Sequence, residues 1–78
     1  MRRFIRPKNS PQVWLVDAGL MWKRAVTSEQ DLKDCNWALV NSGVPILPPP
    51  AGAQVDTIAG VPVWVVTDSF AGSIPTAK

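Results

Sequence analysis

The chain has 78 residues, a formal net charge of +2 and 46% hydrophobic residues, so it forms one domain at most, with a mild basic balance. One cysteine, Cys35, excludes an internal disulfide, and the lack of histidine removes the commonest metal ligand and the commonest general base. A chain this short buries only about 60% of its unfolded surface, so we expect its marginal core to be supported by other subunits.

Residues 1–11 are basic and contain two prolines that favour extended backbone. We predict an extended N-terminal arm here, which adds to the sheet edge of another subunit while its arginines meet carboxylates. The remaining residues, 12–78, are expected to form one small β-rich domain. The candidate partner-contact residues of the arm are Arg2, Arg3, Phe4 and Arg6.

The run Pro11–Asp17 returns near the other end of the chain as Pro62–Asp68, with Val-Trp, further apolar residues and an Asp in both copies. Short β-branched and aromatic runs bounded by turn residues are typical of buried strands. We therefore predict strands at 13–16 and 62–67 as the main strands of one sheet. Gly19 favours a tight turn into a further strand at 20–26, which makes residues 13–26 a hairpin candidate.

A helix is predicted over residues 28–42, because Ser28 can cap it and acidic residues occupy its first turn. Its inward stripe is expected to bury Cys35 as a small packed hydrophobe rather than as a reactive thiol. Asn41-Ser42-Gly43 is a stop signal. The full predicted stripe is Leu32, Cys35, Asn36, Leu39 and Val40.

Residues 45–53 form a Pro-rich connector, in which Pro48-Pro49-Pro50 favours polyproline II backbone. This segment is interpreted as a stiff linker across the domain, with an aromatic-groove ligand as the alternative. A strand at 54–59 and a turn at 68–69 complete the chain. The fold class is therefore α+β, a small and mostly antiparallel sheet with one α-helix.

The pattern of polar residues favours no catalytic site, no metal site and no cofactor. The six carboxylates fall at the start of the helix or at strand ends and turns, where capping explains them. Asp17 and Asp68 would meet if the two Val-Trp strands paired in parallel, but turn capping is the simpler interpretation. No glycine-rich phosphate loop or cysteine cluster is present, so we predict a protein that is not an enzyme.

Four tryptophans are many for so small a core, and tryptophan is enriched in protein interfaces. We expect at least one of them in an intersubunit contact, with Trp22 and Trp37 as candidates. Nucleic-acid binding is a weaker alternative, because the basic residues do not interleave with aromatic ones. No apolar run approaches the roughly 20 residues that a membrane span requires.

Four segments together resemble a known kind of module: Val13–Gly19, Lys23-Arg24, Thr27–Leu32 and Ser73-Ile74-Pro75. Their order is similar to that of small β-rich modules in virion and cell-envelope proteins of bacteriophages that infect actinobacteria. The resemblance implies an origin among phage structural genes and carries no activity with it.

The expected function is that of an accessory structural protein of a phage virion, either a capsid decoration or minor capsid protein or otherwise a tail component. Its partners would be major capsid or tail subunits in many copies, without a small-molecule substrate. It would be made in the host cytoplasm and located in the virion. The alternative is a module that binds host cell-envelope glycan or protein through Trp22 or Trp37.

Overall fold

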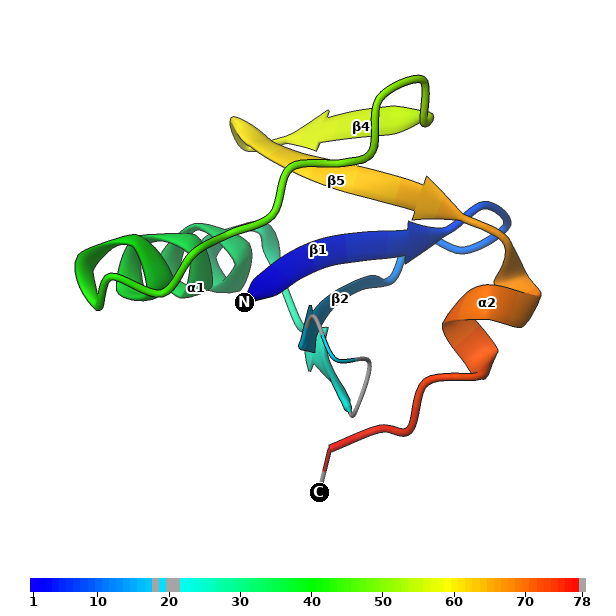
Figure 1. Cartoon of the computed structure of the whole chain (residues 1–78), viewed down its shortest axis with the longest axis horizontal. Helices are drawn as coiled ribbons and strands as arrows, with labels where there is room; N and C mark the ends of the chain where they lie inside the picture. Colours follow the sequence, from blue (N-terminus) through cyan, green and yellow to red (C-terminus); the bar gives the residue numbers. More distant parts are fainter. Residues whose placement is uncertain (18, 20–21, 78) are drawn as a thin grey trace.

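The computed structural model describes residues 1–17, 19 and 22–77 and shows a five-stranded sheet with helices on both faces (Figure 1). The strand order is β3-β2-β1-β5-β4; β1 and β5 are parallel and the other neighbours are antiparallel. This architecture confirms the α+β fold class. The elements are β1 (Arg2–Pro7), β2 (Val13–Asp17), β3 (Lys23–Val26), α1 (Glu29–Asn41), β4 (Val55–Ile58), β5 (Val61–Val66) and α2 (Asp68–Gly72).

Strand β1 is the central strand, so the prediction of an arm outside the core is wrong. Phe4 is 2% exposed and Ile5 is 0% exposed, on opposite faces of the sheet. Neighbouring strand residues point to opposite faces, and the Phe-Ile pair therefore supplies one core side chain to each layer. The basic residues on either side of this pair gave the segment the composition of an arm, although its centre is apolar.

The two faces of the sheet carry separate hydrophobic clusters. Helix α1 covers one face, and α2 with the C-terminal segment covers the other (Figure 1). The buried members of the first cluster are Phe4, Val13, Leu15, Val26, Leu32, Leu39, Val61 and Val63. The buried members of the second cluster are Ile5, Val16, Val66, Ala71 and Ile74.

The two Val-Trp strands, β2 and β5, flank β1 instead of pairing with each other. Ile5 lies opposite Trp14 of β2 and opposite Trp64 of β5. Since β2 is antiparallel and β5 parallel to β1, their Asp residues lie at opposite ends of the sheet. Asp17 is opposite Arg2, whereas Asp68 accepts hydrogen bonds from Asn9, so the considered carboxylate pair does not form.

Helix α1 falls within the predicted range and has the predicted cap. The Ser28 hydroxyl accepts from the Asp31 N–H at 3.0 Å, and Asp31 accepts from the Thr27 N–H at 3.0 Å. Leu32 and Leu39 are buried, but Val40 is 61% exposed, so its assignment to the inward stripe is wrong. The inward stripe is narrow because α1 rests on the sheet along a single line of residues.

The Pro-rich segment crosses from α1 to the far edge of the sheet. It docks on the start of β1, where the Arg2 N–H donates to Pro45 O and the Leu47 N–H donates to Arg2 O. The β4–β5 hairpin then turns through Ala59 and Gly60, both with positive φ. A second helix, α2, replaces the turn predicted at 68–69, capped by the Thr67 hydroxyl. The predicted strand at 20–26 is observed from Lys23 onward; residues 20 and 21 lie outside the described part.

Candidate interaction surface

The arginines of β1 are engaged within the domain. The Arg2 guanidinium lies 4.9 Å from the centre of the Trp22 ring, and that of Arg3 lies 4.9 Å from the Trp64 ring. Arg6 donates to two backbone carbonyls and lies 3.3 Å from an Asp56 carboxylate oxygen. These cation–π contacts and the ion pair engage the three guanidinium groups within the domain. The arginine charges are therefore less available to bind an external anion.

The other sequence-predicted contact residues differ in their accessibility. Phe4 lies in the core and does not reach the surface, while Trp22 is half-buried beneath Arg2. Trp37 is 68% exposed on α1. The structure therefore does not bring the six predicted residues together as one surface, and of these six only Trp37 presents a broad apolar face to solvent.

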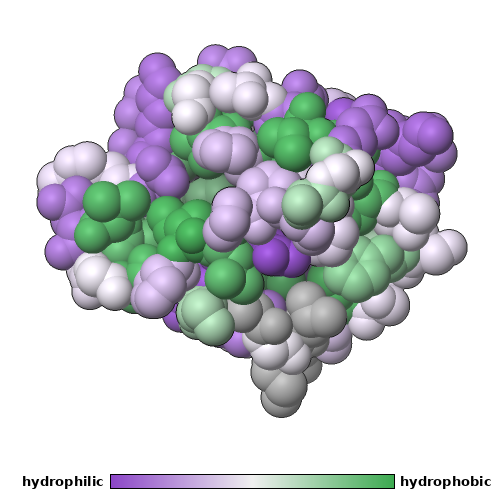
Figure 2. Space-filling model, turned by 45° about the horizontal axis from the view of Figure 1, so that its top comes forward, coloured by the Kyte–Doolittle hydropathy of each residue, from purple (hydrophilic) through white to green (hydrophobic). Residues whose placement is uncertain are grey.

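Trp37 belongs to a line of residues along the outer flank of α1. Residues three and four positions apart are neighbours on a helix surface, so this line runs from the start of α1 to its end. Figure 2 shows hydrophobic residues beside hydrophilic ones on the left side of the molecule, where α1 and the segment after it lie. Within the line itself, Trp37 and Val40 are the exposed hydrophobic residues. We call this line the α1 stripe; it consists of Glu29, Lys33, Asn36, Trp37 and Val40.

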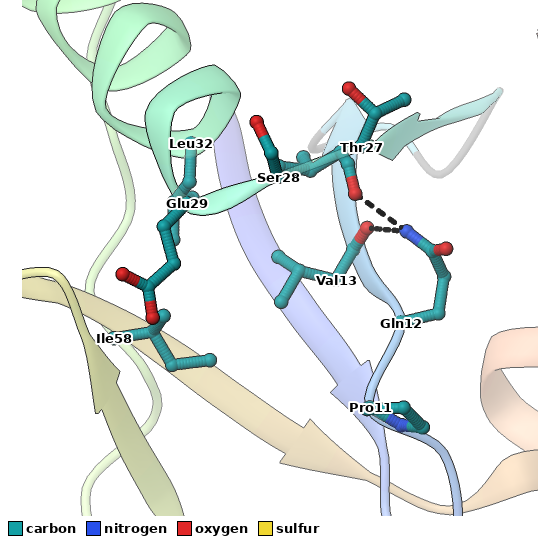
Figure 3. Close-up of a pocket in the computed structure, with 9 residues that line it drawn as sticks. Pro11, Gln12, Val13, Thr27, Ser28, Glu29, Leu32 and Ile58 are labelled. Atoms are coloured by element: carbon teal, nitrogen blue, oxygen red, sulfur yellow. Dashed lines mark hydrogen bonds between the residues drawn. The ribbon is translucent and has the colours of Figure 1, made fainter.

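A cavity of about 420 Å³ opens at the N-terminal end of the α1 stripe (Figure 3). We call it the N-terminal pocket; the Glu29 side chain extends along its rim toward Ile58. Gln12 donates to Val13 O at 2.7 Å and to Val26 O at 2.8 Å, which ties β2 to β3 beside the opening. The lining residues are Pro11, Gln12, Val13, Val26, Thr27, Ser28, Glu29, Leu32 and Ile58.

The floor and the rim of this pocket differ in character. Leu32 and Val13 in the floor are buried and apolar, while Glu29 at the rim is exposed. Asp31 does not line this pocket, and its carboxylate has a pKa below its ordinary value because it accepts the backbone hydrogen bond from Thr27. An apolar group with a neighbouring positive charge is therefore the chemistry that this pocket fits.

A smaller cavity of about 250 Å³ lies on the opposite flank of α1 and contains Cys35. Burial raises the pKa of the Cys35 thiol, which keeps it protonated at neutral pH. The Arg24 side chain donates to its sulfur. Cys35 packs against the first cluster as expected, but it is only partly buried, and Arg24 and Asp31 contact its sulfur, which the sequence did not predict. The lining residues are Arg2, Leu15, Trp22, Arg24, Cys35, Ala38 and Leu39.

Within residues 1–17, 19 and 22–77, no three Cys, Asp or Glu side chains gather closely enough to hold a metal ion. Lys23 is the one buried charged residue identified in this part of the chain, and its ammonium group donates to Ala71 O at 2.6 Å. It also lies 4.4 Å from the centre of the Trp14 ring, so it is used as a structural clamp on α2.

Sequence reasoning missed the N-terminal pocket and the exposure of Val40. The pocket joins three segments that are far apart in the chain, so no local sequence pattern predicts it.

Neither helix of the described residues has the length and apolar character for crossing a membrane. No protein-family model matches the chain, and the searches of curated proteins and of solved structures return no match.

Proposed function

We propose that the chain is a non-enzymatic docking protein that packs on neighbouring protein subunits through the α1 stripe. The observation that supports this function best is the exposure of Trp37, at 68%, one helical turn from Val40, at 61%. Tryptophans that anchor interfaces contribute 2 kcal/mol or more to binding when a partner covers them. An indole left in solvent on a domain with so small a core is expected to be covered in the working assembly.

We further propose that the assembly is a phage virion, in which the chain is a capsid decoration or minor capsid protein, otherwise a tail component. The support for this setting is the resemblance carried by the Val13–Gly19, Lys23-Arg24, Thr27–Leu32 and Ser73–Pro75 segments. A small α+β domain with an exposed helix flank is compatible with it. Major capsid or tail subunits are the proposed partners.

The test is incorporation of the Trp37→Ala variant into virions of the phage that carries this gene. Loss of about 2 kcal/mol of contact energy reduces occupancy on the particle by a factor on the order of 30 at limiting concentration. Val55→Ala is the matched control, because Val55 is also exposed, at 45%, but lies on β4. Quantitative mass spectrometry of purified particles measures both variants. Absence of the native chain from the particles overturns the virion setting, and equal incorporation of Trp37→Ala overturns the role of the stripe.

A cell-envelope binding module is the second candidate, because an exposed indole also suits stacking on a sugar ring. Isolated host cell walls distinguish the two functions. A docking protein stays in solution when walls are pelleted, whereas an envelope module sediments with them and loses that property in Trp37→Ala. Nucleic acid is the least favoured partner, since three arginines of β1 are engaged within the domain.

A further inference from the structure

The α1 stripe is complementary to itself. It carries a carboxylate, Glu29, at one end, an indole, Trp37, near the other end, and Lys33 halfway between them. Neither Glu29 nor Lys33 takes part in an ion pair with another described residue. The stripe therefore holds both signs of charge, an apolar projection and, through the N-terminal pocket, a cavity for an apolar group.

We propose that the partner of the α1 stripe is a second copy of this chain, with the two α1 helices packed antiparallel across a two-fold axis. Each Trp37 then enters the N-terminal pocket of the other copy. The proposal rests on the docking function above and names its partner. A two-fold contact uses the same patch on both subunits, so the patch must be complementary to itself. Here the projecting group is Trp37 and the cavity is the N-terminal pocket.

The spacing along α1 fits this arrangement. Glu29 and Trp37 are eight residues apart, about 12 Å at 1.5 Å per residue. An antiparallel partner helix centred on Lys33 therefore places Glu29 of one copy beside Trp37 of the other. The pocket of about 420 Å³ lies within the volume range of cavities that hold aromatic groups. In Figure 3 the Glu29 side chain lies between the start of α1 and Ile58, at the end of β4.

Charge and shape together favour the antiparallel orientation. Lys33 lies near the two-fold axis, and each of the two Lys33 side chains reaches one turn along the partner helix to Glu29. Both orientations place the two Lys33 side chains near each other, but a parallel pairing also stacks Glu29 on Glu29, and it leaves both pockets without an indole. The separation of the two Glu29 carboxylates and the contact of each Trp37 with a pocket therefore favour the antiparallel arrangement over the parallel one.

The experiment measures the molecular mass of the purified full chain by sedimentation equilibrium from about 1 μM to 1 mM, the range of weak to moderate association. The native chain is expected to dimerise, and Trp37→Ala to weaken dimerisation at least tenfold. Lys33→Glu and Glu29→Lys are each expected to weaken it, because each homodimer then brings like charges together twice. Circular dichroism of every variant checks that α1 is intact.

Mixing the two charge variants provides the sharpest readout. In a heterodimer of Lys33→Glu with Glu29→Lys, both contacts again join opposite charges, so the 1:1 mixture is expected to regain most of the native association. Lys8→Glu is the control for the change in net charge, since Lys8 is exposed and lies off the stripe. It is expected to dimerise as the native chain does. Its heterodimer with Glu29→Lys restores only one of the two opposite-charge contacts, so this mixture is expected to recover less than the mixture of the two stripe variants.

The outcomes separate this inference from the proposed function. A native chain that stays monomeric up to 1 mM overturns the self-association, and Trp37-dependent incorporation into particles would still support docking. A dimer that tolerates Trp37→Ala, or two charge variants that fail to recover on mixing, overturns the antiparallel stripe contact. A Trp37-dependent dimer with recovery on mixing supports it, whether or not the virion setting holds.

Discussion

Replacing Ile5 by alanine tests whether the N-terminal segment is the centre of the fold. Ile5 is fully buried, and it lies between Trp14 and Trp64 at the point where the two Val-Trp strands meet β1. An Ile→Ala change in such a core costs about 2–5 kcal/mol, because the apolar contacts are lost and a cavity remains. A domain of 78 residues has a total stability of about 4–12 kcal/mol at 0.05–0.15 kcal/mol per residue. The variant is therefore expected to lose a large part of its stability.

Thermal and urea unfolding, followed by far-ultraviolet circular dichroism, measure this loss. At about 4–8 °C for each kcal/mol, the melting temperature of Ile5→Ala is expected to fall by at least about 8 °C. Val55→Ala, on the exposed face of β4, is the control and is expected to change stability by less than about 0.5 kcal/mol. If Ile5→Ala melts within about 3 °C of the native chain, the central position of β1 is refuted.

Three further predictions concern groups with specific contacts. The pKa of Asp31 is lowered in the fold, so the stability that the carboxylate contributes is present above the unfolded pKa, near 3.9, and is lost as the pH falls through the lower folded pKa. The difference in unfolding free energy between the native chain and Asp31→Asn is therefore expected to narrow in acid. Urea unfolding from pH 7 to pH 2 measures this difference. Burial raises the pKa of the Cys35 thiol, so its reaction with a disulfide reagent at pH 8 is expected to be slower in the native chain than in urea, as followed by thiolate release; equal rates would contradict this environment. Lys23→Met keeps the side-chain bulk but removes the charged donor to Ala71 O, which then keeps only backbone donors such as the Ile74 N–H at 3.4 Å; a cost of about 1–3 kcal/mol is expected in thermal unfolding. An unchanged melting temperature would show that the clamp on α2 is dispensable.

The individual elements follow from local patterns, but their order in the sheet does not. The Val-Trp runs and the cap at Ser28 predict β2, β5 and α1 close to their observed bounds. The position of β1 was missed because its arginines suggested solvent. Their guanidinium groups instead stack on the rings of Trp22 and Trp64, which lie about 20 and 60 positions away in the chain. Local composition carries no information about such distant partners.

The second helix illustrates a different limit. Helix α2 spans five residues, too few to show a helical period in its apolar residues. Its start signal is nevertheless present, because the Thr67 hydroxyl accepts from the Phe70 N–H at 3.1 Å. The same Thr-Asp-Ser run also fits a turn. Only the burial of Ala71 against the sheet, stabilised by the Lys23 clamp, selects the helix.

Some residues of the candidate site can be predicted from the local sequence, and others cannot. Composition points to Trp22 and Trp37 together, since four tryptophans are many for a core of this size. Only the structure separates them, with Trp37 exposed and Trp22 half-buried. Val40 was assigned to the core because its spacing from Leu32 also fits an inward stripe, and one helical position decides between burial and exposure.

The N-terminal pocket depends on the complete topology of the sheet. Ile58 reaches the start of α1 only because β5 pairs with β1 and carries β4 to the far edge, while Val13 reaches it through the β2–β3 hairpin. A local sequence pattern can therefore point to an exposed side chain such as Trp37, whereas the N-terminal pocket is recognised only once the whole fold is known. For this chain, the pocket supplies the proposed counterpart of the exposed Trp37 in a second copy.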